Sequence, residues 1–266
     1  MITTLRKKTI NDLANTISAN YYNKSLTDLE AAAADEEISF YYDHYENSFD
    51  GMLVYYQGQF HIHLNKDRGN TRNSKRGRFS FAHELGHFFI DEHRIGLKNG
   101  LLRPHGSIHE TNRREPIELE ADYFAGCLLM PDYRFRKPSN RVKFSLDIIL
   151  NLSEEFQASV LATILRFAEI GTHSIMAVVS ENNIVKWFAT SHDFPNWRLK
   201  FKTGSEVPPS TVAGEFFTKR DSKYTSIEDV DPDNWLYPTW APKTRMHEQC
   251  YYFDAYKYVI SIIWFD

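Results

Sequence analysis

The segment His83-Glu84-Leu85-Gly86-His87 places two histidines four residues apart, with a glutamate directly after the first. In an α-helix, side chains at positions i and i+4 lie one above the other, so both imidazoles can reach a single metal ion. Glu84 is turned about 100° from His83 around the helix, and it can therefore reach a water molecule held by the metal rather than the metal itself. Two neutral ligands beside a proton-accepting carboxylate are typical of a metal-dependent hydrolase.

A catalytic zinc site needs a third protein ligand, and several imidazoles and carboxylates follow His87 in the sequence. They are His93, His105, His109, Glu115, Glu118, Glu120 and Asp122. Glu118 and Asp122 stand at i and i+4, beside alanines that allow close packing against the first helix. With Glu118 as the ligand, Asp122 could accept the free N–H of His83 or His87. Glu120 lies about 200° from Glu118 around the helix and cannot share this role.

Two helices must hold these residues. The first is expected over residues 79–92, with Ser80 as its N-cap and phenylalanine and leucine side chains on its buried face. The second is expected to begin at Pro116, a favoured first helical residue, and to end at Met130. Upstream, three segments have the pattern of strands: residues 38–42, 51–56 and 59–65. The sequence therefore predicts an α+β fold in which a small sheet accompanies the two helices.

The remainder of the chain indicates a helical part followed by a β-rich part. Two short helices are expected at residues 145–156 and 159–170, and strands from His173 onward. We therefore expect a catalytic domain over residues 1–131, a helix-turn-helix-like module over 132–171 and a β-rich domain over 172–266. A sensory or a substrate-contacting role is open for the last domain. Its tryptophans are expected in the core: Trp187, Trp197, Trp235, Trp240 and Trp264.

Composition narrows the class of protein. With 42% hydrophobic and 25% charged residues among 266, the chain has an ordinary globular composition. The net charge of −4 argues against a dedicated nucleic-acid binder, which is usually basic. Cys127 and Cys250 make no disulfide framework, and the N-terminal residues do not resemble a signal peptide. No apolar run approaches the ~20 residues of a membrane span, so we expect a cytoplasmic protein without a membrane segment.

The two short helices after Pro131 also suggest another class of function. A hydrophobic helix, a short turn and a Ser-capped helix resemble a helix-turn-helix, in which Thr163 and Arg166 would probe DNA. Arg166 is the one basic residue of that second helix, which argues against direct DNA binding because phosphate contacts would be few. The alternative function is a non-proteolytic DNA- or protein-binding regulator with a vestigial zinc site. Glu84 favours the enzyme, because a structural zinc site needs the ligands but not this carboxylate.

Three segments together resemble the ImmA/IrrE family of metallopeptidases: Phe79-Ser-Phe-Ala-His-Glu-Leu-Gly-His87, Glu118-Leu-Glu-Ala-Asp122-Tyr-Phe-Ala125 and Leu128-Leu-Met-Pro131. The resemblance extends over roughly residues 35–170. It implies a thermolysin-like, gluzincin-like zinc-peptidase core, in which His83, His87 and Glu118 bind zinc and Glu84 is the general base. In some members a C-terminal sensory-type domain follows. Characterised members cleave a helix-turn-helix transcriptional repressor and so relieve repression in mobile elements or stress responses, which implies a protein substrate of this kind.

The expected reaction is zinc-assisted hydrolysis of a peptide bond, in which Glu84 takes a proton from water and passes it to the leaving amine. Mn²⁺ or Fe²⁺ could replace Zn²⁺, because sites of two histidines and a glutamate accept several divalent ions. A further group must stabilise the oxyanion, and the candidates are His93, His105, His109 or a Tyr or His of the C-terminal region. A narrow enclosed pocket at the zinc would instead favour an amidase or peptidase acting on small peptides. The oligomeric state is left open.

Overall fold

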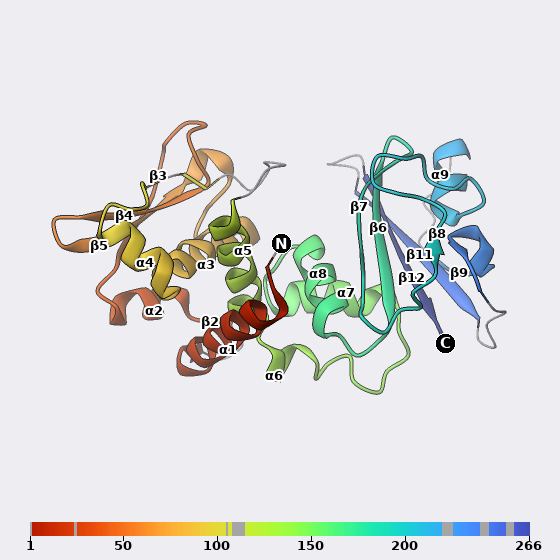
Figure 1. Cartoon of the computed structure of the whole chain (residues 1–266), viewed down its shortest axis with the longest axis horizontal. Helices are drawn as coiled ribbons and strands as arrows, with labels where there is room; N and C mark the ends of the chain where they lie inside the picture. Colours follow the sequence, from red (N-terminus) through yellow and green to blue (C-terminus); the bar gives the residue numbers. More distant parts are fainter. Residues whose placement is uncertain are drawn as a thin grey trace. The chain divides into compact units, whose positions relative to one another are not determined.

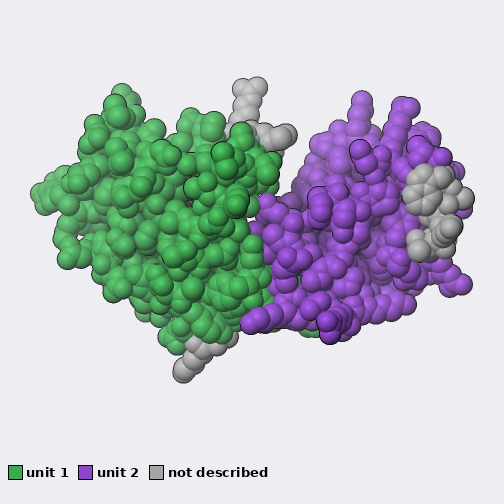
Figure 2. Space-filling model, turned by 60° about the horizontal axis from the view of Figure 1, so that its bottom comes forward, with its two compact units in different colours: residues 1–135, 151–163 green, residues 136–150, 164–266 purple. Residues whose placement is uncertain are grey.

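A computed structural model describes residues 2–23, 26–104, 106–107, 115–219, 226–239, 245–253 and 258–266. The chain forms two compact units, coloured in Figure 2. Unit 1 consists of residues 1–135 and 151–163, and unit 2 consists of residues 136–150 and 164–266. Helices and sheets both contribute to the molecule (Figure 1), so the predicted α+β class is confirmed.

A three-stranded sheet in unit 1 contains β3 (Ser39–Asp43), β4 (Gly51–Tyr56) and β5 (Gln59–Asn65) in the order β3-β5-β4. The antiparallel strands β4 and β5 have the bounds that the alternating sequence predicts. Gln57 and Gly58 form the turn between them with positive φ angles of 49° and 87°, as two-residue hairpin turns require. β3 is parallel to β5. The apolar side chains of β5 are buried and pack toward helix α3 (Lys75–Phe89).

Helix α3 carries the His-Glu-x-x-His sequence and begins earlier than predicted. Its N-cap is Ser74, whose side chain accepts a hydrogen bond from the amide of Gly77. The prediction of Ser80 as the N-cap is wrong, because the polar residues from Lys75 onward already form the first turn. Ser80 lies inside the helix and donates a hydrogen bond to the side chain of Asn70 at 2.7 Å.

Helix α5 (Pro116–Leu129) begins at Pro116 as predicted and packs beside α3 in unit 1 (Figure 1). Gly86 lies at the contact, where a Cβ atom would stand 3.2 Å from the Cα of Ala121 and 3.1 Å from Phe124. The absence of a side chain therefore allows the two backbones to approach closely. This close contact sets the histidines of α3 opposite the carboxylates of α5.

A buried carboxylate anchors the start of β4. Asp50 is fully buried, and its Oδ1 accepts hydrogen bonds from Arg76 at 2.8 Å, Arg68 at 3.1 Å and Asn70 at 3.2 Å. Such partners are required because an unpaired buried charge is strongly destabilising. Arg76 belongs to the first turn of α3, so these contacts hold Gly51 beside the helix that carries the predicted site.

The rest of unit 1 is mainly helical. Its further elements are α1 (Thr4–Asn20), β1 (Tyr22–Asn23), β2 (Leu26–Thr27), α2 (Leu29–Asp35), η1 (Lys66–Arg68), α4 (Asp91–Lys98) and α6 (Asp132–Phe135). Helix α1 packs against α5. Helix α4 was not predicted as a separate helix, because the sequence indicates one helix over residues 79–92 and a loop from His93, and that loop prediction is wrong as far as Lys98. Asp91 and Glu92 in its first turn stabilise the helix because they face the positive end of its dipole.

Helices α7 (Leu146–Glu155) and α8 (Val160–Ile170) agree with the two predicted short helices to within one residue. Residues 132–171 are shared between the two compact units, and the three-domain division stays a prediction. Thr163 and Arg166 are buried. Neither side chain is therefore available on the surface to probe DNA, as the helix-turn-helix alternative would require.

None of the single helices in the described segments is long and apolar enough to cross a membrane. Helices α7 and α8 pass such a test only as a pair, and the chain bends by 111° between them. The apolar side chains Ile149, Leu152, Ile164 and Phe167 of this pair are buried inside the protein.

Unit 2 contains a five-stranded antiparallel sheet in the order β7-β6-β12-β11-β9. Its strands are β6 (Ile175–Glu181), β7 (Ile184–Thr190), β9 (Ile227–Val230), β11 (Met246–Phe253) and β12 (Tyr258–Phe265). Smaller elements accompany it: β8 (Arg198–Leu199), α9 (Val212–Lys219), η2 (Pro232–Asn234) and β10 (Leu236–Tyr237). Asn182 and Asn183 form the turn of the hairpin between β6 and β7 with positive φ angles.

Aromatic side chains contribute much of the unit 2 core. Trp197, Trp235 and Trp264 are buried, as predicted, and Trp235 is among the largest fully buried side chains. Trp187 is only partly buried, because it lies on the edge strand β7. Trp240 lies outside the described residues.

Candidate metal centre

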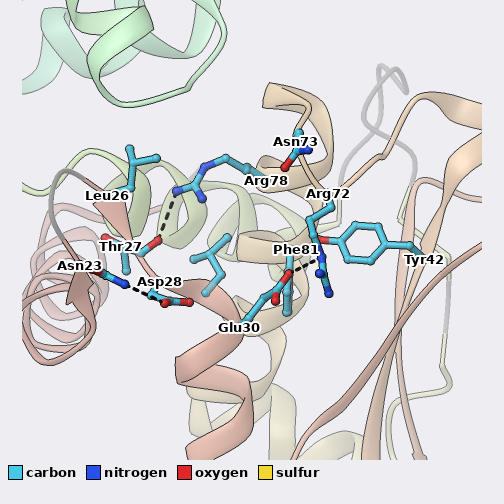
Figure 3. Close-up of a pocket in the computed structure, with 11 residues that line it drawn as sticks. Asn23, Leu26, Thr27, Asp28, Glu30, Tyr42, Arg72, Asn73, Arg78 and Phe81 are labelled. Carbon is cyan, nitrogen blue, oxygen red and sulfur yellow. Dashed lines mark hydrogen bonds and ion pairs between the residues drawn. The ribbon is translucent and has the colours of Figure 1, made fainter.

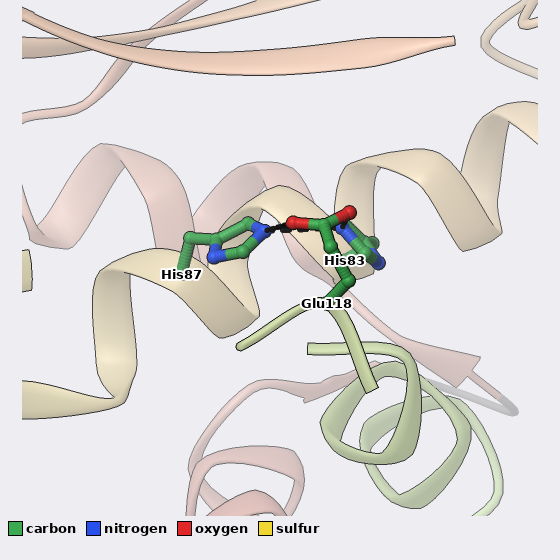
Figure 4. A group of neighbouring side chains, drawn as sticks. All are labelled: His83, His87 and Glu118. Carbon is green, nitrogen blue, oxygen red and sulfur yellow. Dashed lines mark hydrogen bonds and ion pairs between the residues drawn. The ribbon is translucent and has the colours of Figure 1, made fainter. Parts of the chain in front are cut away.

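Three side chains from two helices converge in unit 1: His83 and His87 of α3, and Glu118 of α5 (Figure 4). Glu118 Oε1 lies 3.0 Å from His87 Nε2, and Glu118 Oε2 lies 3.4 Å from His83 Nε2. The two Nε2 atoms are 3.1 Å apart. Both rings are buried, and the Glu118 carboxylate is half-buried. The structure therefore brings together the three residues for which metal binding is predicted.

The spacing and the chemistry of these atoms suit a metal ion. Tetrahedral ligands at 2.0–2.1 Å from zinc are about 3.3 Å from one another. The two Nε2 atoms are separated from each other, and each from the nearer oxygen of Glu118, by 3.0–3.4 Å, close to that value. Imidazole nitrogens and a carboxylate oxygen are also accepted by zinc and by several other divalent ions. The group could therefore hold a metal ion, and its donor types do not select one metal.

Asp122 supports His83 from behind. Its Oδ1 lies 3.0 Å from His83 Nδ1, on the opposite side of the ring from Nε2. When Nδ1–H donates to this carboxylate, Nε2 keeps its lone pair for the space beside Glu118, and the ring orientation is fixed. The sequence left open whether Asp122 would serve His83 or His87, and the structure places it at His83.

The electrostatics of the centre favour a positive charge. Burial disfavours protonation of His83, but hydrogen bonds with Asp122 and Glu118 and the charge of Glu84 outweigh it and raise the pKa of His83 to about 10. Burial lowers the pKa of His87 to about 4, although Glu118 acts in the opposite direction. The carboxylates of Asp122, Glu118 and Glu84 thus favour a positive charge at His83. A metal cation bound between the two rings would supply such a charge.

Glu84 is fully buried and points toward the start of β4. A Cβ atom on Gly51 would stand only 2.6 Å from Glu84 Oε1 and 3.1 Å from its Cγ, so only glycine leaves room for this carboxylate. Glu84 is not part of the group of ligand atoms. That Glu84 serves the reaction rather than the metal stays a prediction. The role of Gly51 was not foreseen, although a glycine at the start of an alternating strand is an unusual choice.

Ser107 is a further residue that sequence reasoning missed. Its Oγ lies 3.0 Å from His83 Nε2, and its side chain is buried. The backbone of Ser107 pairs with β4, because its amide donates to Gly51 O at 2.9 Å and its carbonyl accepts from the Asp50 amide at 2.7 Å. A single serine in a polar loop belongs to no motif or periodic pattern, so the sequence gives no signal that predicts this contact.

The other sequence candidates are not ligands in the described part of the chain. His93 Nδ1 contacts His87 Nδ1 at 3.2 Å, so the ring lies on the side of His87 that faces away from Glu118. Glu120 points away from the ligands, as predicted, and contacts His93 instead. Glu115 is exposed at the start of α5. His105 and His109 lie outside the described residues.

A cavity of about 380 Å³ lies elsewhere in unit 1 (Figure 3). Its lining includes Arg78, which donates to Thr27 O at 3.3 Å, and Arg72, which pairs with Glu30 at 2.8 Å. Arg78 and Phe81 reach it from α3, but they are turned by about 140° and 200° from His83 around that helix. The cavity therefore opens on another side of α3, and none of the three ligands lines it.

Comparison with known proteins agrees with this geometry. Residues 50–167 match the model of the family Peptidase_M78, described as the IrrE N-terminal-like domain. A Mycobacterium tuberculosis protein named as a transcriptional regulator has a similar structure, with a TM-score of 0.60 and 11% identity, over 97% of this chain and 76% of that chain. At this identity the likeness concerns the fold alone. No curated protein sequence matches the chain.

The chain is an α+β protein whose His83, His87 and Glu118 could hold a metal ion within a segment that matches a peptidase family. The matched segment contains both helices of this centre and β4 and β5 before them. The match over residues 50–167 agrees with the resemblance to the ImmA/IrrE family that the motifs predict.

Proposed function

We propose that the protein is a zinc-dependent endopeptidase that cleaves a helix-turn-helix transcriptional repressor and thereby relieves repression. The observation that carries this proposal is the position of Glu84. Its buried carboxylate fills the space that Gly51 leaves open, one residue away from the first of the three candidate ligands. A site that only needed to hold a metal would have no use for this arrangement.

Zinc bound by His83, His87 and Glu118 would supply Lewis-acid activation of the attacking water and of the scissile carbonyl. Glu84 accepts the proton of the water and later delivers it to the leaving amine. Asp122 keeps His83 in the tautomer that leaves its Nε2 free for binding. Burial of both histidines and of Glu84 excludes bulk water, which strengthens the electrostatic interactions among these groups.

The substrate class rests on the resemblance to the ImmA/IrrE family, whose characterised members cleave repressors. The proposal places the protein in the cytoplasm, where such a repressor would act. The cavity of Figure 3 has no ligand of the metal centre in its lining, so it offers no support for an amidase specific for small peptides.

The test uses the helix-turn-helix repressor encoded next to the gene for this protein, or a panel of such repressors if none adjoins it. The full-length protein is incubated with the repressor in zinc, in a chelator, and in a chelator followed by excess zinc. We expect a new repressor terminus, identified by mass spectrometry, in the first and third samples alone. An intact repressor in all three, with zinc bound at one equivalent, would contradict the proposal.

The alternative is a non-proteolytic regulator with a vestigial zinc site, and the same samples distinguish it. A complex with DNA or with the repressor that leaves the repressor intact supports the alternative. We keep the non-proteolytic regulator as a second candidate function because the structurally similar protein from Mycobacterium tuberculosis is named as a transcriptional regulator.

A further inference from the structure

A chain of polar contacts extends from the side of His87 that faces away from Glu118. His87 Nδ1 lies 3.2 Å from His93 Nδ1. The other nitrogen of the second ring, His93 Nε2, lies 3.2 Å from Glu120 Oε2. His93 is only 2% exposed, so its ring nitrogens depend on protein partners rather than on solvent.

This series of polar contacts ends on the N-terminal helix α1. Arg6 of α1 donates from Nη2 to Glu120 Oε2 at 2.6 Å and from Nε to Glu120 Oε1 at 3.0 Å. This paired geometry is the strong form of an arginine–carboxylate contact and fixes the orientation of the carboxylate. Arg6 also binds the more exposed Glu92 at 3.0 Å. A residue far from the motifs in sequence is thereby connected to a candidate metal ligand.

The direction of the hydrogen bonds follows from the use of His87 as a ligand. A neutral imidazole carries one proton, so a His87 that binds through Nε2 carries its proton on Nδ1. The facing His93 Nδ1 must then be the acceptor, because two N–H groups cannot share this contact. The proton of His93 therefore lies on Nε2, where it is donated to Glu120. Each of these steps leaves only one arrangement for the next.

We infer that His93, Glu120 and Arg6 are positioning residues that hold His87 in the tautomer and orientation needed for metal binding. This inference rests on the proposed metal centre. The two ligands of α3 are then supported differently. His83 donates directly to the Asp122 carboxylate, whereas His87 donates to a neutral ring that is itself oriented by a carboxylate and a guanidinium.

Substitutions at His93 test the acceptor. His93→Phe keeps a ring but removes the acceptor, and we expect zinc affinity to fall about 10–100-fold, as is typical when a ligand loses its outer partner. His93→Asn places an amide oxygen where the ring has Nδ1, and its affinity should lie closer to that of the wild type. Zinc affinity is measured by competition with a chromogenic chelator, and thermal unfolding shows that each variant is folded. A folded His93→Phe protein with wild-type affinity would overturn the inference.

Substitutions at the Arg6 end of these polar contacts test the contacts of Glu120 without disturbing the buried rings of His87 and His93. Arg6→Met removes the partner of Glu120, and we expect a severalfold loss of zinc affinity. Glu92→Gln is the matched control, because it removes the other carboxylate of Arg6 and leaves Glu120 in place. Its zinc affinity should equal that of the wild type. If the two variants had equal affinities for zinc, Arg6 would have no part in positioning His87.

Long-range ¹H–¹⁵N spectra of the histidine rings in the zinc-loaded wild-type protein read the tautomers directly. We expect the proton of His87 on Nδ1 and that of His93 on Nε2. A proton on His93 Nδ1 would overturn the inference even if no variant folds. A wild-type protein that binds no zinc would instead contradict the proposed function itself. Failure of this inference and failure of the proposed function are therefore distinguishable.

Discussion

Buried or half-buried acidic groups occur in both compact units, but they have different partners. In unit 2, Glu248 accepts hydrogen bonds from the backbone amides of Val212 and Ala213 at 3.0 and 3.2 Å, and from the indole N–H of Trp235 at 2.8 Å. In unit 1, the carboxylates of Glu118 and Asp122 face imidazole nitrogens instead. The first set of donors is permanent, whereas a ring nitrogen can exchange its proton for a metal ion.

The pKa shifts reflect this difference. Burial raises the pKa of Glu248, because its hydrogen bonds come from neutral groups that do not outweigh the loss of water. Around the metal centre, the carboxylates raise the pKa of His83 to about 10 in spite of burial. One region therefore uses a carboxylate to connect a strand, a helix and a tryptophan, and the other collects carboxylates where a cation is to be held. Burial alone does not mark a functional acid, whereas the identity of its partners does.

The largest effect is expected for Glu118→Ala. It removes one of three ligands, and the loss of zinc affinity should exceed the roughly 100-fold that is the upper range for residues supporting a ligand. The matched control is Glu115→Ala, which alters an exposed glutamate at the start of the same helix and should leave affinity unchanged. Competition titration measures the zinc affinity of both variants. Equal affinities would show that Glu118 is not a ligand.

Substitution of the acid in unit 2 should instead affect stability. Glu248→Ala leaves the indole N–H of Trp235 and two backbone amides buried without their acceptor, and we expect the free energy of unfolding to fall by about 3 kcal/mol. Zinc affinity of the folded variant should not change. Urea unfolding followed by tryptophan fluorescence measures the first quantity. A stable variant with weakened zinc binding would reverse the assignment of the two regions.

A smaller effect is expected for Gly51→Ala. The added Cβ would stand 2.6 Å from Glu84 Oε1, so the carboxylate must move and the rate of peptide hydrolysis should fall about tenfold or more. Zinc affinity should remain, because no ligand is touched. Gly126→Ala is the control, since nothing lies within 4 Å of its added Cβ. Equal hydrolysis rates in the two variants would show that the position of Glu84 is not critical.

The sequence predicted those features that a repeating pattern encodes. Alternation set the bounds of β4 and β5, Pro116 marked the start of α5, and four-residue spacing placed His83 and His87 on one face. The start of α3 was missed because its first turn is polar and exposed on one side. His93 and Ser107 could not be placed, because their contacts depend on how a short helix and a loop return to α3. No periodic pattern in the sequence predicts the position of this short helix or of this loop.

The central claim is that Glu84 performs the chemistry beside a metal held by His83, His87 and Glu118. The most direct measurement compares the wild type with Glu84→Gln, which keeps the size of the side chain but removes its ability to accept a proton at neutral pH. Zinc content by mass spectrometry and cleavage of the repressor are determined on the same preparation. We expect one zinc per chain in both proteins and cleavage by the wild type alone. Cleavage by Glu84→Gln at the wild-type rate would contradict the claim.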